Sequence, residues 1–130
     1  MRLDRLRAFV LALPWTAVVK QWGEHLVFKV AGKMFLVTGE DPSVLDGLTI
    51  KCTPEEFDGL TDIDGIAQAP YCAKRHWVHI ADPSVLPEKE LLARVRRSYD
   101  LVVAKLPKKV RAEIAANGGG TIIGSAKRAV

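Results

Sequence analysis

Two strand-like segments that meet at a tight turn constrain this chain more than any other feature of its sequence. Residues 25–30 carry apolar side chains at every second position, which places those side chains on one face of a β-strand. Ala31 and Gly32 follow, and the glycine can adopt the positive φ that a tight turn needs. Because a second short apolar run follows at residues 33–38, the sequence predicts a β-hairpin here.

Helix and strand patterns surround this hairpin. Further strands are predicted at residues 17–22, 48–52 and 75–80, and helices at residues 3–13 and 87–106, with a short helix capped by Thr53 and Glu56 and a break at Pro107. The long helix has an apolar stripe at the helical spacing. An antiparallel sheet with helices packed on one face buries these stripes best, so we expect an α+β fold.

The length of 130 residues fits one domain. We expect it to span residues 1–116, followed by a glycine-rich and mobile tail at residues 117–130. No apolar run approaches the roughly 20 residues of a membrane span, so we expect no membrane association. The first residues do not read as a signal peptide, because charged residues interrupt their apolar stretch. These observations predict a cytoplasmic protein.

Positive charge is concentrated in the second half of the chain. Residues 1–73 hold 7 Lys or Arg and 10 Asp or Glu, a net charge of −3, whereas residues 74–130 hold 12 and 5, a net charge of +7. A basic half is typical of proteins with an anionic partner such as nucleic acid, although a solvated basic surface has the same composition.

Signatures of catalysis and metal binding are lacking in the sequence. Cys52 and Cys72 have neither zinc-site spacing nor a disulfide framework around them, and reduced, half-buried thiols are the simpler interpretation. His76 and His79 lie three apart on a predicted strand, which points them to opposite faces, while the place of His25 stays open. We therefore expect no metal, no cofactor and no enzymatic activity.

The segment from Tyr71 to Trp77 is the densest candidate site. Two cations, an imidazole and two aromatic rings in seven residues suit phosphate contact and base stacking, although a core Trp77 beside a solvated Arg75 is an equally simple interpretation. A second basic group lies on and after the long helix, although a solvated helix face explains Arg94 and Arg97 equally well. The candidate nucleic-acid-binding residues are therefore Lys74, Arg75, His76, Trp77, Arg94, Arg97, Lys105, Lys108 and Lys109.

Three segments together resemble the MmcQ/YjbR-like family of small bacterial proteins. They are Gly23 to Phe35, Lys74 to Val78, and Ser98 to Lys109, in the family's order. The resemblance implies a frataxin-like α+β arrangement called a double wing, and the family is often labelled DNA-binding from that shape. A frataxin-like shape would also suggest iron binding, but the first helix here is basic rather than acidic.

The sequence thus supports two hypotheses about function. The first is a non-enzymatic module that binds nucleic acid, DNA in particular, through the basic residues named above. The alternative is a domain that binds a protein or a small ligand in a pocket near the segment from Lys74 to Trp77. A protein partner cannot be named from the residues.

Overall fold

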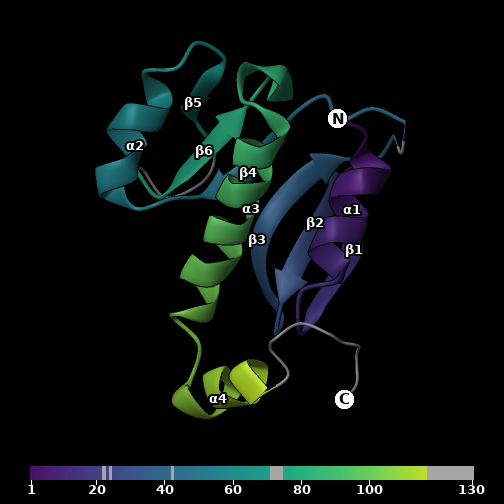
Figure 1. Ribbon diagram of the computed structural model, residues 1–130, viewed down its shortest axis with the longest axis vertical. Coiled ribbons are helices and arrows are strands. Elements are labelled where there is room, and N and C mark those ends of the chain that lie inside the picture. Colours follow the sequence, from purple (N-terminus) through teal and green to yellow (C-terminus); the bar gives the residue numbers. More distant parts are fainter. Residues whose placement is uncertain (22, 24, 42, 71–74, 117–130) are drawn as a thin grey trace.

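The predicted hairpin forms as expected and supplies two strands of an antiparallel sheet, β2 (His25–Val30) and β3 (Lys33–Gly39) (Figure 1). In the computed structural model the described residues are 1–21, 23, 25–41, 43–70 and 75–116. Within them the sheet has six strands in the order β1-β2-β3-β4-β6-β5. The other four are β1 (Thr16–Gln21), β4 (Leu48–Lys51), β5 (Ile66–Gln68) and β6 (Trp77–Ile80).

Three helices cover one face of this sheet, α1 (Leu3–Leu11), α2 (Pro54–Thr61) and α3 (Glu88–Val103) (Figure 1). A fourth helix, α4 (Lys108–Ala116), follows α3 at the lower end of the molecule in Figure 1, and a 3-10 turn forms at Pro83–Val85. The helices α1 and α3 pack on β1 to β4, and α2 packs beside β5 and β6. The predicted α+β class, with helices on one face of an antiparallel sheet, is therefore confirmed.

The long helix α3 lies over the junction of β3 and β4, where a bulge in β3 sets the two strands apart. The register between β2 and β3 shifts after Phe28, and the pairing of β3 with β4 stops at Leu36 and Ile50. Beyond that point the buried Ser98 of α3 joins the strands: its hydroxyl donates to the Phe35 carbonyl at 2.6 Å and accepts from the Lys51 N–H at 2.8 Å. These two bonds satisfy backbone groups that the diverging strands leave unpaired.

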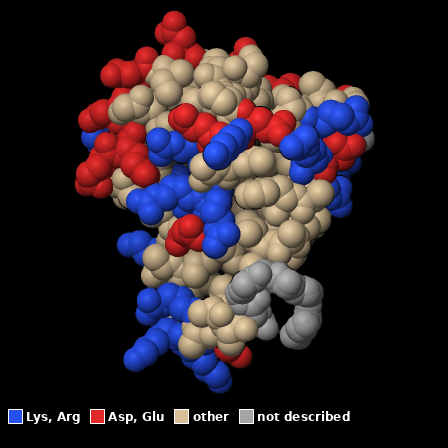
Figure 2. Space-filling model, in the orientation of Figure 1, with Lys and Arg blue, Asp and Glu red and all other residues tan. Residues whose placement is uncertain are grey.

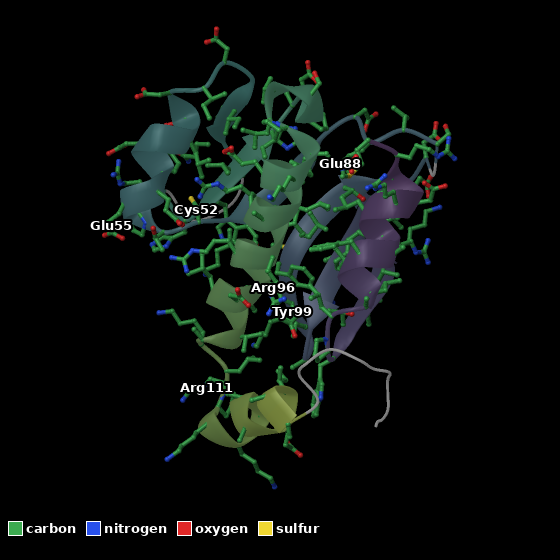
Figure 3. All side chains as sticks on the ribbon, viewed as in Figure 1. Cys52, Glu55, Glu88, Arg96, Tyr99 and Arg111 are labelled. Atoms are coloured by element: carbon green, nitrogen blue, oxygen red, sulfur yellow. The ribbon has the colours of Figure 1, made fainter. Side chains whose placement is uncertain are left out.

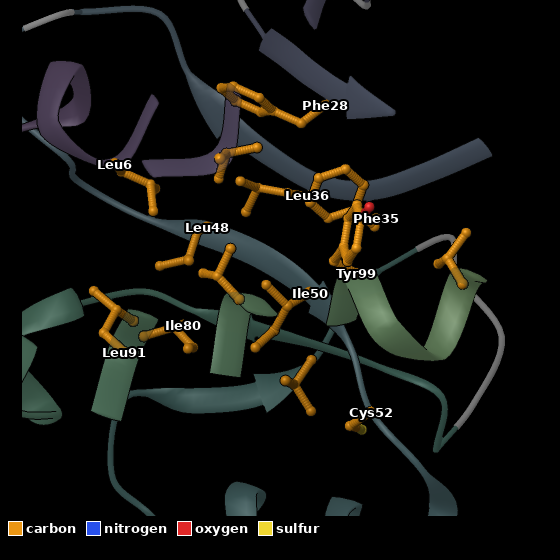
Figure 4. Packing of buried hydrophobic residues seen from close by; sticks show 14 of the residues in the cluster. Leu6, Phe28, Phe35, Leu36, Leu48, Ile50, Cys52, Ile80, Leu91 and Tyr99 are labelled. Atoms are coloured by element: carbon orange, nitrogen blue, oxygen red, sulfur yellow. The ribbon is translucent and has the colours of Figure 1, made fainter. Parts of the chain in front are cut away.

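Tyr99, the next residue on α3, closes the core beside this junction (Figure 4). Its ring meets the Phe35 ring edge-on, with centroids 5.5 Å apart, and its hydroxyl donates to the Pro14 carbonyl at 2.7 Å. Burial raises the pKa of the Tyr99 hydroxyl to about 12. The core continues through the apolar side chains of α1 and the inward faces of the strands.

Most predicted boundaries hold within two or three residues. The capping box of Thr53 and Glu56 forms as predicted, but the helix it starts continues through Gly59 to Thr61. The long helix stops at Val103 rather than at residue 106, and a new helix follows Pro107. The predicted mobile tail at residues 117–130 lies outside the described residues, so the division into a domain and a tail stays a prediction.

None of the helices in the described ranges is both long enough and apolar enough to cross a membrane.

Candidate functional site

The basic segment before β6 does not form the strand that its sequence predicts. The strand begins at Trp77 rather than at Arg75, and Lys74, Cys72 and Tyr71 lie outside the described residues. Arg75 has a φ of 62°, in the left-handed region, which a strand cannot accommodate. His76 is exposed, and its carbonyl accepts a bond from the Cys52 N–H.

The turn at Arg75 brings its guanidinium to α2. There it donates to both carboxylate oxygens of Asp58, at 3.0 and 2.9 Å, and to the Pro54 carbonyl at 3.1 Å. The guanidinium carbon also lies 5.3 Å from the centre of the Phe57 ring. Hydrogen bonding from Arg75 lowers the pKa of Asp58 below its ordinary value. Arg75 therefore fastens α2 to the start of β6, and its charge is already paired.

Arg94 and Arg97 of α3 are also paired, and they share one carboxylate. Their guanidinium nitrogens lie 3.6 and 3.1 Å from the same oxygen of Glu56, whose other oxygen accepts from the Thr53 N–H. Partial burial raises the pKa of Glu56, but the Thr53 N–H and Arg97 outweigh it, and the net pKa is lower than usual. These arginines thus hold α3 against the start of α2.

A second basic group, at the end of α3 and the start of α4, is different. Lys105, Lys108, Lys109 and Arg111 are all exposed, and none of them makes an ion pair with another described residue. Figure 2 shows blue side chains gathered at this lower end, whereas red side chains gather over α2, and Figure 3 labels Arg111 there. We call these four residues the cationic corner.

Trp77 is neither in the core nor on the same side as the cationic corner. It pairs with Lys51 in register, and both side chains alternate with the buried Ile50 and Val78, so they project from the sheet face opposite α3. The Lys51 ammonium lies 5.5 Å from the centre of the Trp77 ring. Trp77 therefore projects from the sheet face opposite the α3 arginines, so the structure does not bring it together with Arg94 and Arg97.

This open face of the sheet carries a cavity of about 950 Å³. Its floor is made by Val37, Thr49 and His79, which are register partners on β3, β4 and β6. One end is polar, with His25 and Asp46 beside two glycines, and the other end is apolar, with Met34 and Pro70. We call it the sheet cavity.

The two imidazoles that face the sheet cavity are His25 and His79. The Nδ1 atom of His79 lies 3.0 Å from the Thr49 hydroxyl oxygen. Burial lowers the pKa of His79, and the charge of His25 lowers it further. His76 precedes the strand, so the expectation that His76 and His79 share one strand is wrong.

None of the predicted site residues that the structure describes lines the sheet cavity, although the sequence contains one signal for it. Thr49 and His79 alternate with the buried residues of their strands, so polar side chains lie at positions that face away from the helices. Strand pairing, which the sequence does not give, is what brings them together with His25. The sheet cavity extends toward Trp77 through Met34 and Pro70, but among the described residues neither His76 nor Trp77 lines it. Lys74 lies outside the described residues, so the proposed pocket near Lys74 to Trp77 stays a prediction.

Groups suited to a metal or to thiol chemistry are not assembled in the described part of the chain. No three His, Cys, Asp or Glu side chains converge there as metal ligands. Burial raises the pKa of the Cys52 thiol, which makes it less reactive.

Comparison with known proteins places this fold. Residues 11–101 match the model of the YjbR family, and no curated protein matches the chain. The crystal structure of a Deinococcus radiodurans protein with a DUF419 domain is similar at a TM-score of 0.77 and 31% identity, over 88% of each chain. A Pseudomonas syringae protein of known structure, at 21% identity and a TM-score of 0.54, shares the fold over 66% of this chain and 86% of its own.

Proposed function

The chain belongs to the YjbR family, and we propose that it acts as a non-enzymatic DNA-binding module whose contact surface is the cationic corner. The observation that carries this proposal is the contrast in pairing among the basic residues. Four exposed cations at the end of α3 and on α4 have no carboxylate partner among the described residues, so their charge is available to phosphates.

The proposal narrows the set of nine residues that the sequence suggests. Arg75, Arg94 and Arg97 form ion pairs with carboxylates of the same chain, so we expect them to contribute little to DNA binding. Lys74 lies outside the described residues, and His76 and Trp77 lie at the start of β6 rather than in the cationic corner. Lys105, Lys108 and Lys109 remain, and Arg111 joins them. Phosphate contacts of this kind are independent of base sequence, so we expect weak sequence preference.

Fluorescence anisotropy with a labelled 20-base-pair duplex at 50 mM salt tests the proposal. We expect binding by the native chain and roughly 100-fold weaker binding when Lys105, Lys108 and Lys109 are all changed to alanine, because affinity depends steeply on the number of neutralised phosphates. The matched control changes Arg7, Lys33 and Lys89 to alanine, which removes the same charge from exposed positions elsewhere. If both variants lose DNA affinity equally, the net charge of the chain, and not the cationic corner, determines binding.

The sheet cavity favours a second function, the binding of a small ligand. Its volume lies within the range of roughly 300 to 1,000 Å³ that ligand sites occupy, and its lining combines apolar walls with a few polar groups. A fragment screen by NMR tests this function. We expect hits that shift the amide signals of β3 and β4 around the cavity floor, and a screen that yields no such hit contradicts it.

A further inference from the structure

We propose that the sheet cavity binds an uncharged, planar molecule whose polar head both donates and accepts hydrogen bonds, as a carboxamide or the edge of a heterocycle does. This proposal deepens the second candidate function and rests on it. It concerns the sheet face opposite α3, and it is independent of DNA binding at the cationic corner.

The polar end of the cavity is kept open by two glycines, Gly39 and Gly47. A Cβ atom added at Gly39 would lie 3.3 Å from a carboxylate oxygen of Asp46. One added at Gly47 would lie 3.3 Å from both Cε1 and Nε2 of the His79 ring. Any larger residue at these positions would press on the polar groups that line the cavity, so the glycines leave room for a ligand head beside them.

The rest of the lining fits the flat body of such a molecule. Val37 lies in the middle of the floor, and Met34 and Pro70 line the end toward Trp77. A methionine side chain adapts to the outline of an aromatic ring and makes favourable contacts with it. The cavity is therefore apolar at one end and polar at the other, as an amphiphilic planar ligand requires.

The pair formed by His79 and Thr49 can recognise either half of an amide. The Thr49 hydroxyl occupies Nδ1 of His79 and leaves Nε2 for the ligand. When the hydroxyl donates to Nδ1, the proton of the neutral ring is on Nε2, which then donates; when it accepts from Nδ1, the Nε2 atom accepts. Rotation of the hydroxyl, together with exchange of the ring proton between Nε2 and Nδ1 through solvent, thus adapts the site to a donor or to an acceptor.

Hydrogen-bonding capacity, rather than net charge, favours a neutral head over a charged one. Among the described residues, the ionisable groups that face the cavity are the imidazoles of His25 on β2 and His79 on β6 and the carboxylate of Asp46 before β4, while Lys29 and Lys51 lie farther along the same face. Asp46 is exposed to solvent, which screens both its repulsion of an anion and its attraction for a cation. A carboxylate offers acceptors alone and a cation offers donors alone, whereas a carboxamide offers both, as the site does.

Three probes of one shape and different charge test the ligand class: benzamide, benzoate and benzamidine. We expect benzamide to bind at pH 7.5 with a dissociation constant on the order of 1 mM, as a fragment of this size does, and each charged probe to bind at least about threefold more weakly. NMR titration of a ¹⁵N-labelled chain gives the three constants. As the pH falls through the lowered pKa of His79, its ring becomes charged and both ring nitrogens donate, so we expect benzamide to weaken relative to benzoate.

Two variants place the binding in the cavity. Gly47→Ala adds a methyl group against His79 and should weaken benzamide at least fivefold, whereas the control Gly59→Ala adds one in open space on α2 and should change nothing. The double variant Thr49→Val with His79→Phe removes the polar pair but keeps its shape, and it should abolish the preference for benzamide. Thermal melts confirm that each variant is folded.

The outcomes separate the two levels of the proposal. If none of the probes binds at concentrations up to 20 times the expected constant, or if Gly47→Ala leaves their affinity unchanged, the sheet cavity is not a ligand site. If benzoate or benzamidine binds more tightly than benzamide at pH 7.5, the cavity is a ligand site of another class.

Discussion

The middle and the carboxyl end of α3 both carry cationic side chains, and these side chains make opposite kinds of contact. Toward the middle of the helix, Arg94, Arg97 and Ser98 bind groups of α2, β3 and β4. At its carboxyl end and on α4, Lys105 and the lysines that follow bind nothing else in the described protein. Before a paired arginine can bind a phosphate, its ion pair within the fold must break. An unpaired, hydrated lysine can bind a phosphate without that loss.

Reversal of charge at the cationic corner has the largest expected effect on DNA binding. Lys108→Glu with Lys109→Glu places carboxylates where phosphates would lie, and we expect DNA affinity at 50 mM salt to fall by more than about 100-fold. The free energy of unfolding should stay within about 0.5 kcal/mol of the native value, because both residues are exposed. Anisotropy and urea unfolding measure the two effects, and a large loss of stability would contradict the assignment of these lysines to a free surface.

Which basic residues form ion pairs within the fold could not be predicted from the sequence. Arg75, Arg97 and Lys108 look alike as basic residues in a basic half. Asp58 and Glu56, the partners of Arg75 and Arg97, come from a helix that strand pairing and packing place beside these arginines, whereas Lys108 has no such partner among the described residues.

The elements themselves were largely predictable, because alternation, capping and proline breaks are local signals. The hairpin of β2 and β3 and the cap at Thr53 depend on such signals alone. The left-handed turn at Arg75 and the sheet cavity depend on distant contacts, and local patterns did not indicate them.

Ser98→Ala tests the stabilising role of the middle of α3, since it removes a hydrogen-bond partner from two buried backbone groups. The Phe35 carbonyl and the Lys51 N–H would both lose their bond to the hydroxyl. We expect a loss of about 1 to 3 kcal/mol in the free energy of unfolding, with no effect on DNA affinity. Urea unfolding measures it; Ser84→Ala, at an exposed position, is the control.

Glu56→Ala has a smaller expected effect on stability. It removes half of the capping box and frees Arg94 and Arg97 at once. We expect a loss of about 1 kcal/mol, typical of a lost helix cap. We expect DNA affinity at 50 mM salt to rise by no more than about threefold in this variant, because the freed arginines lie away from the cationic corner. A larger rise would show that these arginines can also contact DNA.

The smallest effect is the pH dependence of this pairing. The pKa of Glu56 is lower in the folded chain than in the unfolded one, so its contribution to stability is full above the unfolded value of about 4.3 and is lost as the pH falls through the folded value. We expect the native chain to lose stability more steeply than Glu56→Gln below pH 5. Urea midpoints between pH 6 and pH 3 give the two slopes, and equal slopes would remove Glu56 as a contributor.

The salt dependence of DNA binding tests the central claim most directly. With four unpaired cations, the logarithm of the binding constant should fall with the logarithm of the salt concentration at a slope of about −3 to −4, since each phosphate contributes about −0.9. Changing Lys105, Lys108 and Lys109 to alanine should reduce this slope to about −1, while the control at Arg7, Lys33 and Lys89 should keep it. No binding at 50 mM salt, or a slope that is the same in all three proteins, would contradict the claim that the cationic corner binds DNA.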